Sequence, residues 1–494
     1  MDLVSTRNTG NRVNPATAIS QGLSDEGGLF VPCVFPKFAP DEIVGLWDKR
    51  YFERAAFIAA PFLSGFTFDE LLSYACTAYS SFPRDAAPIV SLDSKTHVLE
   101  LFHGPTLAFK DFALCFLPPL IGASLKKTGI DKTAVVLVAT SGDTGSAALE
   151  GFSGADGTAV CVFYPDGGVS ALQRLQMTTQ TKENLKVIGI RGNFDDAQSG
   201  VKGIFGDSLI RENLESRGYM LSSANSINWG RIVPQIAYYF SAYADLVGSG
   251  KINSGEEINV VVPTGNFGNI LAAYYARKCG LPLGKLVCAS NSNNVLTDFI
   301  HTGVYDKNRK FYTTVSPSMD ILISSNLERF VFDLYEGDCG AVSAMAKLLS
   351  KTGRYEVEPS ALAKAQSVLD AGCATDLETL ETIRKTHDKY GYLCDTHTAV
   401  ALNVLEKHMR ETGDETHALV VATASPFKFA DSVLDALNAQ NTGNDFGNLN
   451  ELARVSGVDV PHVLAALAKK EERHKTICAP NEMKDELLGW LADM

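Results

Sequence analysis

A single lysine stands out in the stretch HGPTLAFKDFALCFL, residues 103–117. Lys110 has apolar and aromatic neighbours on both sides, an unusual setting for a strongly hydrated ammonium group. Two interpretations are open. Lys110 lies on the solvent-exposed face of an amphipathic helix, or it is buried away from water. In the second case, burial lowers the pKa of the amine and makes it nucleophilic. The local pattern by itself favours the first interpretation.

A glycine-rich loop, GNFGN at residues 265–269, follows an apolar strand and opens a helix. Gly265 and Gly268 allow the backbone to approach a ligand closely. The loop amides and the helix N-terminus then point at one spot, which suits a phosphate. The loop has neither the Walker A spacing nor the G-x-G-x-x-G spacing of dinucleotide sites, so the pattern favours a phosphate that does not belong to a nucleotide.

Three apolar strands end in a threonine that leads into a loop of small or polar residues, at Thr140, Thr264 and Thr423. In open α/β sheets, ligands bind where loops leave the carboxyl ends of strands. For any one of these loops an ordinary turn is the better interpretation. Three loops of the same kind favour a binding site.

Two further segments contain groups that can bind anions. The loop SGDTG offers Ser141 and Thr144, although a helix cap with Asp143 on the helix dipole is the better interpretation of this loop taken alone. The segment at residues 222–235, SSANSINWGRIVPQ, is dense in amides and hydroxyls and contains Arg231, a residue suited to bidentate anion binding. A turn before a helix with a solvated Arg231 explains this segment about equally well. A lone histidine such as the one at position 397 is more often structural than catalytic. A reactive lysine, a phosphate cradle and a hydroxyl-bearing loop are together what pyridoxal phosphate requires.

The composition is that of a soluble globular protein. The net charge is 44 − 57 = −13, which argues against nucleic acid or an anionic membrane as the main partner. The ten cysteines show no metal-binding spacing, so we expect reduced thiols in a cytoplasmic protein. The longest apolar run, residues 112–122, is interrupted by two prolines and is far too short to span a membrane.

The elements that must position these residues follow an alternating pattern. Apolar strands are predicted at residues 133–140, 157–165, 184–192, 257–264, 285–290 and 417–423, and helices follow most of them. This alternation indicates a largely parallel sheet buried on both faces, in two α/β halves with a cleft between them. We predict a mostly helical N-terminal domain at 1–95, a catalytic core at 96–435 and a helical C-terminal segment at 436–494.

Several long motifs give the sequence a family resemblance. HGPTLAFKDFAL, VATSGDTGSAA, SSANSINWGRIVPQ, VVPTGNFGN and MDILISSNLERF occur in the chain, and with STR near the start and VVATASPFKF near the end they resemble the threonine synthases of the longer fungal and bacterial class. The resemblance covers nearly the whole chain. It implies the pyridoxal-phosphate fold of type II, which is similar to the tryptophan synthase β subunit.

The resemblance also implies a role for each motif. Lys110 matches the lysine that forms the Schiff base with the cofactor, and Thr423 matches the hydroxyl residue at the pyridine nitrogen. The cofactor-phosphate loop is matched by Gly265, Asn266, Phe267, Gly268 and Asn269. The segment that receives the substrate carboxylate is matched by Ser141, Asp143 and Thr144, and the expected ligands of the substrate phosphate are Asn225, Ser226, Asn228 and Arg231.

The implied reaction converts O-phospho-L-homoserine and water into L-threonine and phosphate, the last step of threonine biosynthesis, with Lys110 as the base for the α-proton. Two alternatives remain: a related phospho-lyase that releases a keto acid, and a non-catalytic protein that binds a phosphate ligand on the same fold. The chain keeps GPT, GNFGN and Lys110, which favours the synthase. It departs from the family pattern at Cys115, Thr396 and Ser425. We expect a monomer or small homo-oligomer and no bound metal.

Overall fold

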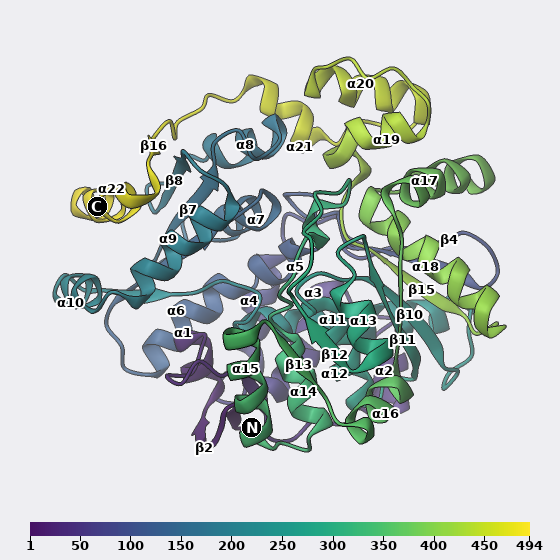
Figure 1. Cartoon of the computed structure of the whole chain (residues 1–494), viewed down its shortest axis with the longest axis horizontal. Helices are drawn as coiled ribbons and strands as arrows, with labels where there is room; N and C mark the ends of the chain where they lie inside the picture. The colour runs from purple at the N-terminus through teal and green to yellow at the C-terminus, as the bar shows by residue number, and fades with distance from the viewer.

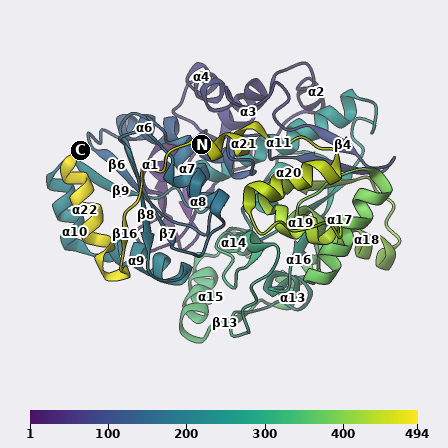
Figure 2. The same ribbon diagram turned by 90° about the horizontal axis from the view of Figure 1, so that it is seen from above.

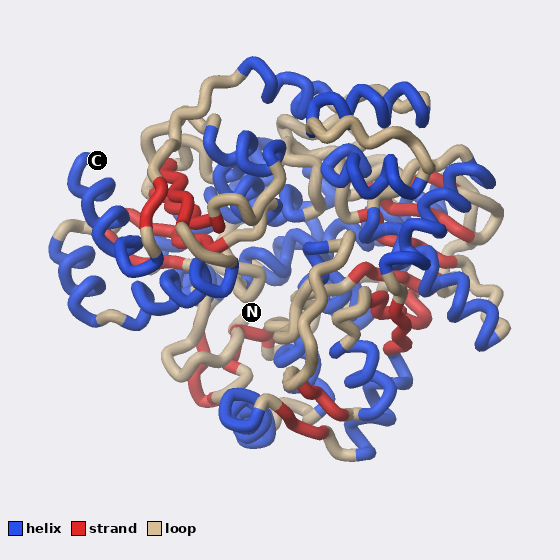
Figure 3. Tube along the Cα trace, turned by 45° about the horizontal axis from the view of Figure 1, so that its top comes forward, coloured by secondary structure: helices blue, strands red, loops and turns tan.

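Two β-sheets lie on opposite sides of the molecule in the computed structural model, which describes all 494 residues (Figures 1 and 3). The larger sheet has the strand order β14-β11-β10-β15-β5-β4. Its strands are β14 (Leu369–Cys373), β11 (Leu283–Ser290), β10 (Ile258–Pro263), β15 (Ala418–Ala422), β5 (Thr96–Glu100) and β4 (Ile89–Ser91). All neighbours run parallel except β4 and β5 at one edge.

The smaller sheet is parallel throughout, with the order β16-β8-β7-β6-β9. Its strands are β16 (Ile477–Cys478), β8 (Leu185–Ile190), β7 (Thr158–Pro165), β6 (Thr133–Ala139) and β9 (Tyr219–Ser222). The predicted α/β class with two mostly parallel halves is confirmed. All six strands expected from apolar runs are present, because strands buried on both faces are apolar without alternation.

Helices cover both sheets. Those around the smaller sheet are α5 (Lys110–Leu114), α6 (Leu117–Lys127), α7 (Asp143–Gly151), α8 (Ala171–Thr178), α9 (Phe194–Gly206) and α10 (Ser208–Ser216). Those associated with the larger sheet are α11 (Trp229–Gly248), α12 (Gly268–Lys278), α13 (Val295–Thr302), α16 (Pro359–Val368), α17 (Asp376–Tyr390), α18 (Thr396–Thr412) and α19 (Ala430–Ala436). The largest core cluster includes residues of both sheets and of α11, whose twenty residues are almost all buried.

The first part of the chain contains more than helices. Its helices are α1 (Pro15–Gln21), α2 (Pro40–Val44), α3 (Tyr51–Ala59) and α4 (Phe68–Ala78). The same region contains a three-stranded antiparallel sheet of β1 (Leu3–Ser5), β2 (Asn8–Val13) and β3 (Phe30–Pro32), and α1 lies between β2 and β3 in the chain. The sequence did not predict this sheet, since its strands are short and β2 is polar. Helix α1 packs on α6 and α11, so this region adjoins the two α/β halves. The division of the chain into three domains stays a prediction.

An excursion between α13 and β14 contains β12 (Val304–Asp306), β13 (Arg354–Glu356), α14 (Leu327–Leu334) and α15 (Cys339–Thr352). The end of the chain then crosses the molecule, from α20 (Asp445–Ser456) and α21 (His462–Ala465) beside α19 to β16 and α22 (Met483–Asp493) beside α9 (Figures 1 and 2). None of the helices has both the length and the apolar run needed to cross a bilayer.

Candidate active site

Lys110 is the first residue of α5 and follows a tight turn. Leu107 in this turn has a φ of 60°, which is a strained backbone conformation for a bulky residue such as leucine. The buried carboxylate of Asp111 fixes the turn by accepting hydrogen bonds from the amide of Thr106 at 2.8 Å and from the Thr106 hydroxyl. Gly104 allows this packing, because a Cβ there would lie 2.5 Å from an Asp111 oxygen. The short helix therefore starts at a fixed point and aims Lys110 in one direction.

The amine of Lys110 lies inside the protein, with only 15 % of its side chain exposed. Its nearest carboxylate is Asp143 at the start of α7, where Nζ is 3.5 Å from Oδ2. Burial lowers the pKa of Lys110, and Asp143 partly opposes this effect; Lys428 and Arg231 lower the pKa further by repulsion. Of the two interpretations of this lysine, the geometry favours the dry amine.

Asp143 is the centre of the polar contacts around Lys110. Its Oδ1 accepts from the buried amine of Lys428 at 2.8 Å and from the side-chain amide of Gln173 at 3.2 Å. Its Oδ2 accepts from the hydroxyl of Ser318 at 3.3 Å. Burial opposes the ionisation of Asp143, but the two lysines hold its pKa well below the usual range. Sequence reasoning missed Lys428, although a lysine in the apolar segment after β15 has the same signature as Lys110.

The loop 265–269 has the geometry of an anion cradle. Phe267 takes the left-handed conformation, with a φ of 62°, and α12 begins at the next residue. The five backbone N–H groups of the loop donate to no acceptor within the protein. Its carbonyl side is bound instead: Ser324 Oγ donates to Gly265 O at 2.7 Å, and Asn326 N donates to Asn266 O at 3.1 Å. The loop is thus held from one side and presents its amides on the other.

Contacts between loops bring the predicted segments to one place. A Cβ on Gly265 would lie 2.8 Å from the carbonyl oxygen of Ser318, whose hydroxyl reaches Asp143. On the other side, the amide of Phe109 donates to Thr423 O at 2.8 Å. The 265–269 loop, the start of α7, the end of β15 and the Lys110 turn are therefore neighbours, although they are far apart in the sequence.

The predicted substrate ligands divide into two sets. The amides of Ser141, Asp143 and Thr144 have no acceptor in the protein, whereas those of Gly142 and Gly145 are bound by the Thr140 hydroxyl. Such a loop at a helix N-terminus can receive an anion.

The second set follows β9, where α11 begins. Arg231 is buried, and burial lowers its pKa to about 10; its Nε–H has no partner, while another guanidinium N–H donates to Ala224 O. Asn225 is exposed and Ser226 half-buried. Asn228 differs, because its side chain binds Ile19 O, Ser223 O and the amide of Gly230. It caps α11 and has little capacity left for a ligand.

His397 and Asp395 form a buried pair beside Asp143. Nδ1 of His397 is 2.7 Å from Asp395 Oδ2, and Nε2 accepts from the amide of Ser318 at 3.1 Å. Both ring nitrogens are thus used inside the protein, so His397 holds the Ser318 loop in place, in keeping with a structural role. No group of histidine, cysteine and carboxylate side chains is arranged to hold a metal ion.

The residues of this site fit pyridoxal phosphate. The cofactor needs an anion site for its phosphate, and five unpartnered amides at a helix N-terminus provide one. It needs a primary amine for its aldehyde, and Lys110 provides one with a lowered pKa. It needs a partner for the ring nitrogen, and Thr423, whose backbone oxygen is bound by the Lys110 turn, carries a hydroxyl that can serve.

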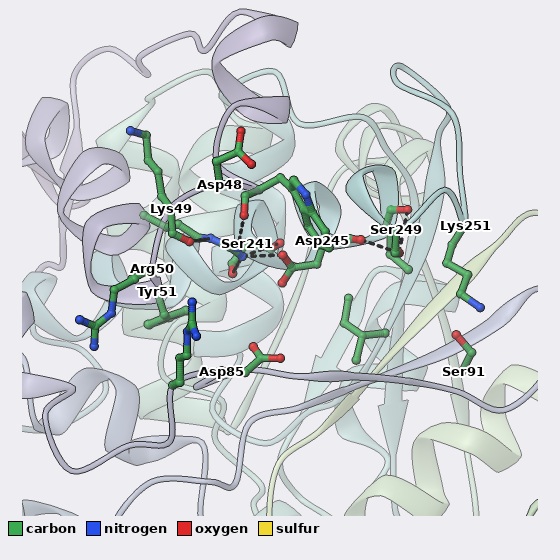
Figure 4. A pocket seen from close by; sticks show the side chains of 15 residues that line it. Asp48, Lys49, Arg50, Tyr51, Asp85, Ser91, Ser241, Asp245, Ser249 and Lys251 are labelled. Atoms are coloured by element: carbon green, nitrogen blue, oxygen red, sulfur yellow. Dashed lines mark hydrogen bonds and ion pairs between the residues drawn. The ribbon is translucent and has the colours of Figure 1, made fainter.

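A separate cavity of about 500 Å³ lies between α3 and α11, and Figure 4 shows side chains that line it. The ion pair of Arg54 and Asp245, 2.7 Å apart, lines it together with Ser241. Burial raises the pKa of Asp245 to about 6, against the attraction of Arg54. Arg54 also donates to Ser241 Oγ at 2.7 Å, so its contacts with Asp245 and Ser241 join α3 to α11, while Lys49 O and Trp47 O bind it to the segment before α3. None of the residues predicted for chemistry lines this cavity.

Comparison with known proteins agrees with the site. Residues 92–378 match the family model described as pyridoxal-phosphate dependent enzyme. Residues 2–79 match the threonine synthase N terminus and residues 398–485 the threonine synthase C-terminal model. The PLP-bound crystal structure of threonine synthase from Brucella melitensis is 36 % identical, with a TM-score of 0.88 over 99 % of both chains.

Two curated relatives place the chain further. It is 37 % identical to threonine synthase of Pseudomonas aeruginosa over 98 % of this chain and 96 % of the relative. It is 40 % identical to human threonine synthase-like 1 over 85 % of this chain, but it spans only 57 % of the length of that relative. The cofactor of the family is pyridoxal phosphate. The chain belongs to the threonine synthase family of pyridoxal-phosphate-dependent enzymes.

Proposed function

We propose that this chain converts O-phospho-L-homoserine and water into L-threonine and inorganic phosphate. The family supports this activity, since relatives named threonine synthase cover nearly the whole chain. One observation carries the proposal. The buried amine of Lys110 contacts Asp143, Asp143 contacts Ser318, and Ser318 packs against the 265–269 loop with its five unpartnered amides. This arrangement provides a reactive amine and a phosphate site in one place.

Lys110 is the catalytic residue of the proposal. When bound, pyridoxal phosphate supplies a conjugated ring that accepts electrons as a proton leaves the carbon next to the substrate amine. The Lys110 amine takes that proton and later returns one to the same carbon. A base works best when its pKa lies near the working pH, and burial lowers the pKa of Lys110 in that direction.

The binding roles follow from the free donors. The amides of Gly265, Asn266, Phe267, Gly268 and Asn269 would hold the cofactor phosphate, and the hydroxyl of Thr423 would be the partner of the ring nitrogen. Ser141, Thr144 and their loop amides bind the substrate carboxylate. Arg231, with Asn225 and Ser226, binds the substrate phosphate. We leave Asn228 out of this group because its side chain is used in capping α11.

Product analysis tests the activity. The purified holoenzyme is incubated with O-phosphohomoserine, and threonine, phosphate and keto acid are measured. Threonine with an equal amount of phosphate is the expected result, while a keto acid with ammonia assigns the chain to the lyases and contradicts the proposal. Release of no phosphate by a protein that binds the cofactor would leave only a binding function. Lys110→Ala is expected to lower the rate at least about 100-fold.

The lysine assignment has its own test. Borohydride reduces the bond between cofactor and lysine, and peptide mapping then finds the modified residue. We expect the label on Lys110. Lys428 is the informative competitor, because its amine lies against the same carboxylate; a label there contradicts the assignment.

A further inference from the structure

Two buried lysines share one carboxylate in this site. Lys428 Nζ is 2.8 Å from Asp143 Oδ1, and Lys110 Nζ is 3.5 Å from Oδ2. The Lys428 side chain is 1 % exposed and also donates to Thr106 O at 2.9 Å. Its closer contact and its second bond hold Lys428 in place, whereas Lys110 has Asp143 as its only hydrogen-bond partner.

The proposed reaction requires Lys110 to leave Asp143, since its amine must reach the cofactor and the substrate. A buried carboxylate that loses its only cation is left uncompensated, which strongly destabilises the site. Lys428 prevents this because it stays bound to the other oxygen. Gln173 and Ser318 satisfy Asp143 further as neutral donors.

The charges around the pair favour a neutral Lys110. Lys110 is faced by Asp143 from α7, by Lys428 from the 3-10 turn Pro426–Phe429 and by Arg231 from α11. Asp143 also faces His397 from α18. Asp111 of α5 faces Lys428. Because Lys110 is faced by two other cations and by one close carboxylate, the loss of its proton relieves repulsion.

We propose that Lys428 is a positioning residue for the reaction. It fixes Asp143 and keeps that carboxylate neutralised, so that Lys110 is oriented by Asp143 and is still free to lose its proton and move. Nothing in the role of Lys428 requires contact with substrate or cofactor. The inference rests on the proposed function for its chemistry, but its first test does not measure the reaction.

The test follows the Lys110 amine in the apoprotein. Trinitrobenzenesulfonate reacts only with the unprotonated form of an amine. Peptide mapping then gives the rate of modification of Lys110 as a function of pH. In Lys428→Met, Lys110 is the only lysine in contact with Asp143, so the carboxylate favours the ammonium form of Lys110. We expect the curve to move to higher pH by about one unit, which means about tenfold slower modification at a fixed lower pH. Lys428→Arg keeps the charge and should restore most of the wild-type curve.

A double-mutant cycle separates positioning from direct repulsion. If Lys428 acts through Asp143, adding Lys428→Met to Asp143→Asn shifts the Lys110 curve much less than Lys428→Met does alone. An equal shift in both backgrounds would mean that Lys428 acts only by its own charge, and it would overturn the proposal. An unshifted curve in Lys428→Met would overturn it as well.

The same set of variants includes a control for folding. If Lys428→Met does not fold, the double variant with Asp143→Asn should fold, because it removes the carboxylate of Asp143 together with the lysine that neutralised it. A double variant that stays unfolded contradicts the proposal. In the holoenzyme, the acidic limb of the kcat/KM profile should move with the Lys110 curve. If the wild type makes no threonine, the proposed function fails, while the modification curves still decide the role of Lys428.

Discussion

At the residue scale, the proposed phosphate cradle depends on Gly265 more than on Gly268. A Cβ on Gly265 would lie 2.8 Å from the backbone oxygen of Ser318, which cannot move without shifting the loop. A Cβ on Gly268 would meet only ordinary contacts of 3.6–3.9 Å. We therefore predict that Gly265→Ala weakens cofactor binding about tenfold or more, as overpacking of a tight contact costs about 1–3 kcal/mol. Gly268→Ala is the matched control and should bind nearly as the wild type does. Reconstitution of apoprotein with pyridoxal phosphate measures both.

Asp111 makes the Lys110 turn sensitive to pH. Burial raises its pKa from 3.8 to about 6, against the hydrogen bonds from Thr106. A raised pKa means that the stability it gives is complete below about pH 4 and is lost as the pH rises through about 6, a total of about 3 kcal/mol. Asp111→Asn does not titrate, so the difference in unfolding free energy between wild type and variant should change by about this amount between pH 4 and pH 7. Urea unfolding of both apoproteins measures it, and a constant difference would contradict the prediction.

At the element scale, the relative placement of α5 and α7 decides the distance between Lys110 and Asp143. The two helices touch at Gly151, where a Cβ would lie 2.1 Å from Leu114 O. Gly151→Ala must therefore push the helices apart; we expect a loss of about 2 kcal/mol in stability and a slower reaction. Gly203→Ala, in α9, is the control: a Cβ there meets nothing within 4 Å, so it should stabilise the helix by about 0.5–1 kcal/mol. Thermal unfolding and threonine formation are the measurements, and equal behaviour of the two variants would refute the argument.

The sequence predicted elements with a strong local signal and missed those defined by tertiary contacts. Long β-branched runs gave the six central strands. The short strands β9 and β14 and the polar β2 form because a neighbour pairs with them. The same division holds in the site. The proposed role of GNFGN could be predicted from its local sequence, but Lys428 acquires its partner only when the end of β15 meets the start of α7. The helix considered around Lys110 is short, since α5 ends at Leu114 and a separate helix, α6, starts at Leu117.

At the scale of the whole molecule, the C-terminal segment joins the two α/β halves. Helix α22 buries Met483, Leu487 and Leu491 in the core cluster of α9 and the smaller sheet. Leu487 is fully buried, so Leu487→Ala should cost about 2–5 kcal/mol in the free energy of unfolding. Leu377→Ala removes a leucine that is 77 % exposed on α17 and should change it by less than about 0.5 kcal/mol. Denaturant unfolding compares the two; a mild effect of Leu487→Ala would mean that α22 is not part of the cooperative fold.

The two-residue strand β16 bears on how the protein is made. It pairs with β8, which would otherwise be the edge of the smaller parallel sheet. The ribosome synthesises β8 long before β16, so during translation this edge exposes unpaired backbone groups next to apolar strands. Exposed edges of this kind are where nascent chains pair with one another. We therefore expect the growing chain to be most prone to aggregate in the interval between the synthesis of β8 and that of β16, and a chaperone would protect it most in that interval.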